Sequence, residues 1–410
     1  MKKAMISLCV SCVVLCMLLV FVAVQEKQGK TNTRVIRQEP LPGAAGPVRK
    51  EESQKQTEQE EPVAELPQVE LVMIGDMLMH TRVLDSGKTQ DGAYSYDHLF
   101  RQVKDKVEQA DLAIVNQETI LGGTELGLSS YPCFNSPYEL GDAEVRAGFD
   151  VILHGTNHAL DKHARGINNC MQFWNEKYPD IAVLGIHDSW DDQKDIYVYT
   201  KEGIRIAVLN YTYGTNGIEM PDGMEYCVDY LEEERVRKDV EKAKELSDFV
   251  VVCPHWGTEY QLTADASQKR WCEKFLDWGV DLVIGTHPHV IEPVEMYTRK
   301  DGSRMLVYYS LGNFVNGTES KKKGIGVRMI GGMADVTIGY EPDGTVGILS
   351  YSILPVVCHE DEGTSYTVYF LEDYTKELAK RNWIVESDPN FSKEYCDSVV
   401  REVWGKESRN

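Results

Sequence analysis

The most constraining feature of this chain is a series of short apolar runs, each followed closely by polar residues. The runs that read as buried strands cover residues 69–74, 112–115, 150–153, 181–184, 204–210, 249–253, 280–284 and 306–309. Between them lie amphipathic segments, such as the one with Ile167, Cys170, Met171 and Trp174 at helical spacing. Strands that alternate with helices predict an α/β fold, with helices packed on a largely parallel or mixed sheet.

Six polar clusters at the ends of apolar runs contain the residue types that hold divalent cations: histidine, aspartate, asparagine and glutamate. The clusters are Gly75-Asp76, Asn116-Gln117-Glu118, Thr156 to Asp161, His255 to Tyr260, Gly285 to His289, and Ser310 to Phe314. In an open parallel sheet, ligands bind at the carboxyl ends of the strands. We therefore expect residues far apart in the sequence to meet at one edge of a sheet.

Two clusters carry most of the evidence for a metal site. His287 and His289 are separated by one proline, and in an extended segment residues i and i+2 point the same way. Both imidazoles are therefore expected to face one site. In the second cluster, His158 is a candidate general acid, and Asp161 is placed to orient a histidine. Asn157 offers a neutral oxygen to a metal.

The remaining candidates are open to two interpretations each. Asp76 is either a metal ligand, able to bridge two cations, or the cap of a following helix. His255 is either a ligand or a core histidine, and Glu259 is a candidate acid, base or outer partner of the site. Glu118, taken alone, is a loop residue.

The two ends of the chain differ from its centre. Lys2 and Lys3 precede an apolar run over residues 4–24, long enough to span a bilayer. We predict a signal anchor at residues 1–25 that places the rest of the chain outside the cell. A cleaved signal peptide is the alternative. Residues 26–68 are polar and predict a disordered linker, residues 69–357 the folded domain, and residues 358–410 an extension that is helical from about Tyr366.

Charge and missing motifs exclude several classes of function. The formal net charge is −22 and the pI about 4.9, which argues against a nucleic acid as partner because phosphate binding needs a basic face. The chain also lacks a Gly-x-Ser-x-Gly elbow, a phosphate-binding Gly-x-x-x-x-Gly-Lys loop and a Gly-x-Gly-x-x-Gly turn. Serine hydrolase, nucleoside-triphosphatase and dinucleotide-dependent functions therefore have no support.

In this order, the six clusters resemble the motifs of the CapA family, bacterial proteins of poly-γ-glutamate capsule biosynthesis with a metallophosphatase-like core. The resemblance covers roughly Val69 to Pro355. It implies a four-layer α-β-β-α sandwich of the calcineurin-like phosphoesterase type. It also implies one or two divalent ions (Mn, Zn or Fe) and a contact between His158 and the transferred group. The implied metal ligands are Asp76, Glu118, Asn157, His255, His287 and His289.

One departure concerns the number of ions. The first strand carries no Asp-x-His motif, which dinuclear phosphatases use for one metal, and this leaves a second ion in question. Two hypotheses of function remain. The chain is either a surface hydrolase acting on a phosphoester or a γ-glutamyl polymer, or a non-enzymatic subunit that binds the anionic polymer or membrane-bound synthase and export components. The sequence does not establish turnover.

Overall fold

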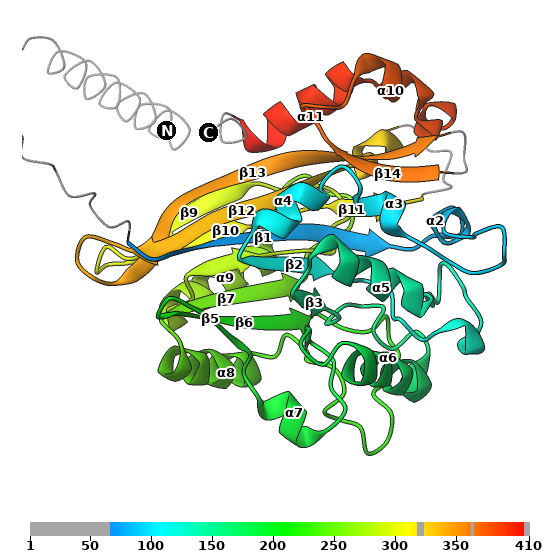
Figure 1. Cartoon of the computed structure of the whole chain (residues 1–410). Helices are drawn as coiled ribbons and strands as arrows, with labels where there is room; N and C mark the ends of the chain where they lie inside the picture. Colours follow the sequence, from blue (N-terminus) through cyan, green and yellow to red (C-terminus); the bar gives the residue numbers. More distant parts are fainter. Residues whose placement is uncertain (1–65, 318–323, 362–364, 406–410) are drawn as a thin grey trace, which may run out of the picture. The chain divides into compact units, whose positions relative to one another are not determined.

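The computed structural model describes residues 66–317, 324–361 and 365–405. Its larger sheet has the strand order β14-β13-β12-β1-β2-β3-β4, with β11 pairing onto β1 (Figure 1). The strands of this sheet are β1 (Gln68–Leu78), β2 (Leu112–Asn116), β3 (Val151–Leu153), β4 (Ala182–Leu184), β11 (Asn313–Asn316), β12 (Ile330–Tyr340), β13 (Val346–Asp361) and β14 (Ser365–Phe370). Strands β1 to β4 are parallel, and β12 to β14 extend the sheet antiparallel.

The second sheet has the order β5-β6-β7-β8-β10-β9. Its strands are β5 (Val198–Lys201), β6 (Ile204–Thr212), β7 (Phe249–His255), β8 (Leu282–Ile284), β9 (Val294–Thr298) and β10 (Arg304–Tyr308). Its central strands β6, β7, β8 and β10 are parallel, and β5 and β9 close the edges antiparallel. The expected α/β architecture with largely parallel central strands is therefore confirmed.

The helices lie between and after these strands. They are α2 (Thr81–Ser86), α3 (Asp97–Phe100), α4 (Lys104–Gln109), α5 (Tyr138–Ala147), α6 (His163–Lys177), α7 (Trp190–Lys194), α8 (Glu233–Leu246), α9 (Ala266–Trp278), α10 (Lys376–Arg381) and α11 (Lys393–Trp404), with short 3-10 turns η1 (Thr124–Leu126), η2 (Ile325–Met329) and η3 (Trp383–Glu386). Figure 1 shows α8 on the side of the domain opposite α10 and α11.

The alternation of side chains in β6 shows how the two sheets pack. Ile206 and Val208 belong to the core between the sheets, whereas Ala207 and Leu209 belong to a separate core under α8 and α9. Successive strand residues point to opposite faces, so one face of β6 meets the other sheet and the other face meets helices. Cys253 of β7 touches Met73 of β1, with Sγ and Sδ 3.8 Å apart. The predicted four-layer sandwich is confirmed.

The tail differs in part from its prediction. We expected a helix from about Tyr366, but Ser365–Phe370 form β14, which pairs antiparallel with β13. Tyr366, Thr367 and Val368 are all buried, and the aromatic and β-branched composition of this segment favours a strand. Strand β13 runs across the expected boundary between the domain, which ends at residue 357, and the extension, which starts at residue 358. Helices follow from Lys376 onward.

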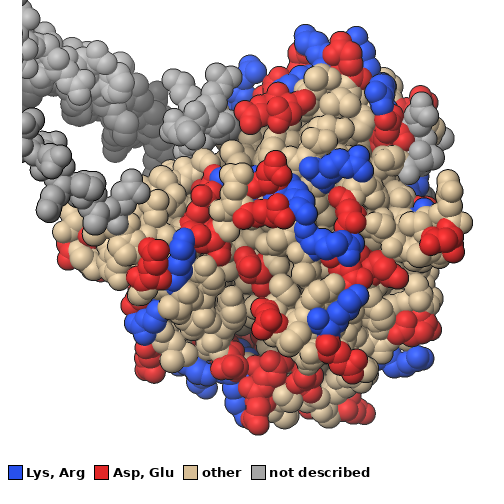
Figure 2. Space-filling model, viewed as in Figure 1, with Lys and Arg blue, Asp and Glu red and all other residues tan. Residues whose placement is uncertain are grey.

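No helix in residues 66–317, 324–361 and 365–405 is long and apolar enough to cross a membrane. The anchor predicted at residues 1–25 and nearly all of the predicted linker lie outside the described residues. Figure 2 shows acidic and basic side chains interspersed on one face of the domain.

Candidate metal centre

Strand pairing brings the first clusters together at the carboxyl ends of the larger sheet. Asp76 of β1 stands opposite Asn116 of β2 on one side and Asn313 of β11 on the other. The Asn116 side-chain amide donates a hydrogen bond to Asp76 Oδ1 at 2.9 Å. In the second sheet, His255 at the end of β7 pairs with Thr286, which follows β8. The predicted meeting of distant strand ends is therefore observed.

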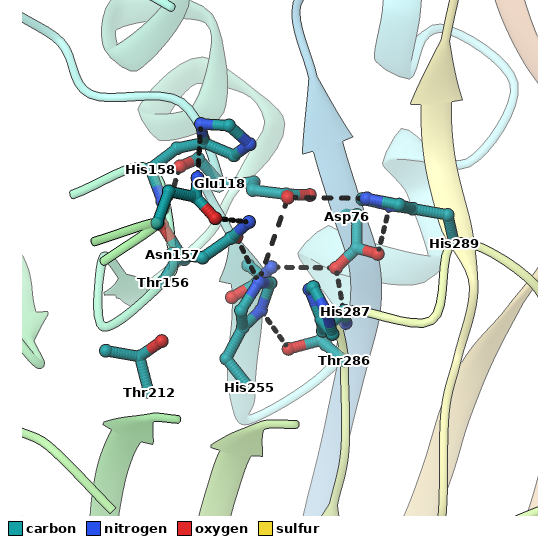
Figure 3. Close-up of polar contacts among 12 residues, drawn as sticks. Asp76, Glu118, Thr156, Asn157, His158, Thr212, His255, Thr286, His287 and His289 are labelled. Atoms are coloured by element: carbon teal, nitrogen blue, oxygen red, sulfur yellow. Dashed lines mark hydrogen bonds and ion pairs between the residues drawn. The ribbon is translucent and has the colours of Figure 1, made fainter. Parts of the chain in front are cut away.

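Two groups of candidate ligands share one carboxylate. Asp76, Glu118 and His289 place ligand atoms within 4.8 Å of one another, and so do Glu118, His255 and His287. Glu118 Oε1 lies 3.6 Å from His289 Nε2 and 3.7 Å from His255 Nε2. Figure 3 shows Glu118 connected to both histidines. We predicted that Asp76 is able to bridge two cations, and this stays a prediction; the residue common to the two groups is Glu118.

The surroundings of the Glu118 carboxylate indicate whether this cluster can bind a metal. The residue is fully buried, and neither of its carboxylate oxygens accepts a hydrogen bond from the described residues. Burial is the main reason that the pKa of Glu118 lies well above its ordinary value. An ionised carboxylate out of water is costly unless it is paired or coordinates a metal. A divalent cation would supply the missing partner, so the residues fit a metal.

His289 is held so that one nitrogen remains for the site. Its Nδ1 lies 3.1 Å from Asp76 Oδ2 and 3.1 Å from Asn313 Oδ1. Both partners are acceptors, so Nδ1 carries the proton and Nε2 faces Glu118 unprotonated in the neutral ring. Burial acts to lower the pKa of His289, but Glu118 and Asp76 outweigh it and raise the pKa to about 9. Binding of a metal would release the second proton of this ring, and Nε2 would then serve as a ligand.

The backbone around His287 and His289 is not the extended segment that we predicted. Both residues have positive φ, 99° and 58°, a region that costs non-glycine residues on the order of 1–3 kcal/mol. Their rings still approach each other, with centroids 5.8 Å apart. His287 Nδ1 is buried and makes no hydrogen bond to the described residues. The two imidazoles therefore converge through a strained turn rather than through strand alternation.

His255 completes the second group of ligands. Its Nδ1 lies 2.9 Å from the Thr286 hydroxyl, and its Nε2 lies 2.9 Å from Asn157 Oδ1. Burial, followed by the neighbouring His287 charge, holds the pKa of His255 well below its ordinary value. A neutral imidazole is the form that binds metals. Asn157 and His255 therefore lie side by side as candidate ligands.

His158 and Asp161 form a separate pair at the edge of the cluster. His158 Nδ1 lies 2.7 Å from Asp161 Oδ2, which also accepts from the Phe134 backbone N–H at 2.6 Å. The Phe134 ring packs edge-on against the His158 ring, with centroids 4.7 Å apart. With Nδ1 bound to the carboxylate, Nε2 is the nitrogen left for a substrate. Glu259, by contrast, is exposed, although it can reach His287 and His289.

Several residues of this centre were not singled out from the sequence. Thr286 holds His255, and Asn216 receives a 3.2 Å hydrogen bond from the Asn157 amide. Asn216 lies in the loop after β6 at a φ of 54°. Its flanking glycines, Gly214 and Gly217, mark a turn but carry no sign of function.

Most of the described chain, including the candidate metal centre, matches a known protein family. A sequence model described as bacterial capsule synthesis protein PGA_cap matches residues 70–318. The "Capsule biosynthesis protein CapA" of Bacillus anthracis is 28% identical over 285 residues, which covers 66% of this chain and 62% of that protein. The "PGA biosynthesis protein CapA" of Bacillus subtilis (strain 168) is 27% identical over 265 residues, covering 59% and 62% respectively. The chain thus spans less than two thirds of the length of these curated relatives.

Solved structures with a partial likeness include two nucleotidases. The NAD nucleotidase of Haemophilus influenzae has a TM-score of 0.44 and 12% identity, covering 82% of this chain and 67% of its own. A putative 5'-nucleotidase from Staphylococcus aureus has a TM-score of 0.46 and 16% identity, covering 73% and 57%. With TM-scores below 0.5, we infer nothing about the reaction of this chain from these two enzymes.

All six polar clusters fall within the matched range of 70–318, which is more than half of the 410 residues. The chain therefore belongs to the family of bacterial capsule synthesis proteins described as PGA_cap, and the predicted resemblance to CapA proteins is confirmed.

Proposed function

We propose that this capsule synthesis protein is a metal-dependent hydrolase that acts on a phosphoester or a γ-glutamyl bond in an anionic polymer such as poly-γ-glutamate. The observation that carries the proposal is the Glu118 carboxylate. It is buried, has no hydrogen-bond partner among the described residues, and is shared by two groups of candidate ligands. Glu144 of α5 is also a buried carboxylate without a hydrogen bond from the described residues. What distinguishes Glu118 is its position, because three buried histidines offer ligand atoms beside its carboxylate in the two groups.

The ligand atoms divide between two positions around Glu118. One position would be held by Asp76, Glu118 and His289, and the other by Glu118, Asn157, His255 and His287. A divalent cation (Mn, Zn or Fe) would supply polarisation of the scissile phosphoryl or carbonyl oxygen.

His158 supplies the proton chemistry. Asp161 holds its Nδ1–H, which keeps Nε2 turned away from the carboxylate and fixes the orientation of the ring. From Nε2, a protonated His158 can donate to the leaving group. Phe134 covers one edge of this ring and restricts the approach of water there.

Metal analysis of the full-length chain, purified with detergent present, tests the site. We expect at least one equivalent of Mn, Zn or Fe in the wild type and loss of bound metal in His289→Ala. His98→Ala is the matched control, because His98 is half-buried, pairs with Ser86, and belongs neither to the six clusters nor to the groups of candidate ligands. A wild-type chain that holds no metal, and takes up none on dialysis, would contradict the proposal.

Turnover needs its own measurement. The same preparations are assayed with a phosphodiester, a phosphomonoester and polyglutamate. We expect the wild type and His98→Ala to hydrolyse one of these compounds, and His289→Ala to hydrolyse none of them. Metal uptake with polymer binding, and with no change in polymer length, would instead favour a binding subunit of a polymer synthase or export complex.

The same proposal places the domain outside the cell, held by the N-terminal segment. Its support is the apolar run at residues 4–24 behind Lys2 and Lys3. Protease added to intact cells should remove the domain, whereas a cytoplasmic control protein stays whole. Carbonate extraction at high pH should leave the full-length chain in the membrane fraction. Protection from the protease would contradict the outward orientation.

A further inference from the structure

Tyr213 is an exposed residue in direct contact with the candidate metal centre. It is the first residue after β6 and is 50% exposed, whereas Asn157, His255 and His287 are buried. Its backbone N–H donates a hydrogen bond to the His255 carbonyl at 3.0 Å. The centroids of the Tyr213 and His287 rings are 4.6 Å apart. Two candidate ligands therefore fix the backbone and the ring of a tyrosine that borders the solvent.

The hydroxyl of Tyr213 lies beside a third candidate ligand. Burial, followed by the charges of Glu259 and Glu118, raises the pKa of Tyr213 to about 12, and a hydrogen bond with the Asn157 side chain acts in the opposite direction. A hydrogen bond that lowers the pKa of a phenol is one that the amide N–H donates to the phenol oxygen. The Tyr213 hydroxyl is therefore placed next to Asn157, as an acceptor of its amide.

The donors and acceptors of Asn157 show how these groups are oriented. A side-chain amide has two N–H donors and one carbonyl oxygen. The amide nitrogen of Asn157 donates to Asn216 Oδ1 at 3.2 Å, and its second N–H serves the Tyr213 oxygen. Asn157 Oδ1 lies 2.9 Å from His255 Nε2, so the oxygen faces the candidate ligands. Because the Tyr213 oxygen accepts from Asn157, its own hydrogen is left to donate to another group.

A phenol O–H in this position is suited to a charge that develops on the substrate. Hydrolysis of a phosphoester and hydrolysis of a γ-glutamyl bond both place negative charge on oxygens of the group that is attacked, and a fixed donor stabilises that charge. A neutral donor also does not repel a divalent cation, whereas a lysine at the same place would. Tyr213 therefore meets the chemical requirements of a donor that works beside a metal.

We propose that Tyr213 is a catalytic residue of the candidate metal centre, whose O–H donates a hydrogen bond to the oxygen of the attacked group on which negative charge develops. This inference rests on the proposed function, which it deepens by naming a second residue that contacts the substrate. The two donors have separate roles: His158 acts on the leaving group, and Tyr213 acts on an oxygen that stays with the attacked group.

The test compares Tyr213→Phe with the wild type, as full-length chains with detergent and Mn²⁺ present. The change removes the hydroxyl and keeps the ring against His287. Titration calorimetry measures the Kd for inorganic phosphate, a tetrahedral oxyanion that resembles the attacked group. We expect binding to weaken about 10- to 100-fold, the range for hydrogen bonds to charged groups. For the compound that the wild type hydrolyses, kcat should fall about 100-fold. Metal content should match the wild type.

Tyr226→Phe is the matched control. Tyr226 lies in the same loop between β6 and α8, is half-buried, and packs its ring against Trp190, with centroids 5.6 Å apart. It belongs to none of the groups of candidate ligands, so the same loss of a hydroxyl should leave the Kd for phosphate and kcat unchanged.

The outcomes separate this inference from the proposed function. Wild-type affinity for phosphate or wild-type kcat in Tyr213→Phe overturns the role of Tyr213, and so does a metal-loaded wild type that binds no phosphate. Each of these results leaves the metal site itself in place. Loss of metal from Tyr213→Phe alone also overturns the role, because the hydroxyl would then be a metal ligand. Absence of metal from the wild type overturns both the proposed function and the role of Tyr213.

Discussion

Two buried clusters of histidine and carboxylate in this domain have similar composition and different bonding. The first is the candidate metal centre around Glu118. The second, the His187 network, consists of His187, Asp192, Gln193, Asp229, Arg235 and Asp239. His187 Nε2 lies 2.7 Å from Asp229 Oδ2, and His187 Nδ1 lies 3.2 Å from Asp192 Oδ2. Arg235 then pairs with Asp229 at 3.2 Å and with Asp239 at 2.6 Å.

The difference lies in which polar atoms have partners. In the described part of the chain, no side-chain atom of the His187 network is buried without a hydrogen bond. In the candidate metal centre, both Glu118 oxygens, Asn116 Oδ1 and His287 Nδ1 are buried without one. A satisfied network stabilises the fold by itself, whereas several unsatisfied donors and acceptors that face one another can be satisfied by a bound ion. Composition alone does not separate a structural cluster from a binding site.

The largest expected effect is on activity, from Glu118→Gln. Loss of a carboxylate shared by both ligand groups should remove bound metal and lower hydrolysis about 1000-fold, equivalent to several kcal/mol of transition-state stabilisation. The metal-free variant loses the 3.6 Å charge pair between Glu118 and His289 but breaks no hydrogen bond, so its free energy of unfolding should stay within about 2 kcal/mol of the metal-free wild type. Metal analysis and urea unfolding check both parts. A large loss of stability would instead show that Glu118 stabilises the fold.

The converse change is Asp229→Asn in the His187 network. Removal of one partner from a buried ion pair leaves His187 and Arg235 without their shared carboxylate, so the free energy of unfolding should fall by about 3 kcal/mol. Metal content and hydrolysis at 25 °C should stay at the wild-type level. Urea unfolding at pH 7 measures the loss. Unchanged stability together with lost activity would reverse the comparison between the two clusters.

Added metal should stabilise the chain by a slightly smaller amount. At about 100 times the Kd, a ligand that binds only the folded state raises the free energy of unfolding by about 2.7 kcal/mol. We expect this increase with Mn²⁺ in the wild type and in Asp229→Asn, its reversal by EDTA, and its absence in Glu118→Gln. Thermal unfolding with and without EDTA gives the measurement. An equal response in Glu118→Gln would place the metal elsewhere.

The sequence predicted where these groups lie better than what they do. Asp76, His255 and His289 follow buried strands, and strand periodicity with parallel pairing is enough to bring such positions to one edge. The shared position of Glu118 could not be predicted in this way, because the loop after β2 is held by residues distant in sequence: the Gln117 N–H donates to the Leu153 carbonyl of β3, and the Thr156 hydroxyl donates to the Glu118 carbonyl. Tyr213 follows β6, whose end carries none of the six clusters, so no pattern in the sequence marked it.

The fold shows the same limit. The apolar runs predicted a largely parallel or mixed sheet and the family resemblance implied two facing sheets, while β14 was expected to be helical. Tyr369, Leu371, Leu378 and Trp383 suggested a helical pattern, but Tyr369 lies in the strand. Pairing with β13 decided the outcome, and a partner strand is not visible in the local sequence.

The smallest expected effect is a pH dependence that belongs to the His187 network. Burial acts to lower the pKa of His187, but hydrogen bonds to Asp192 and Asp229 outweigh it and raise the pKa to about 9. Because this pKa exceeds that of an unfolded histidine, the stabilisation is complete below about pH 6.5 and is lost as the pH rises toward 9. Asp192 is partly exposed, and solvent screening reduces the expected loss to about 1–2 kcal/mol.

His187→Gln isolates this contribution. Urea unfolding in EDTA is compared between the wild type and His187→Gln from pH 6 to 9, so that the contribution of His289, which is common to both chains, cancels. The stability difference should be largest at pH 6 and shrink toward pH 9. A difference that stays constant would mean that His187 is neutral in the folded chain and that its two carboxylates do not act as its counter-charges. The His187 network would then be a set of neutral hydrogen bonds, and charge pairing would no longer distinguish it from the candidate metal centre.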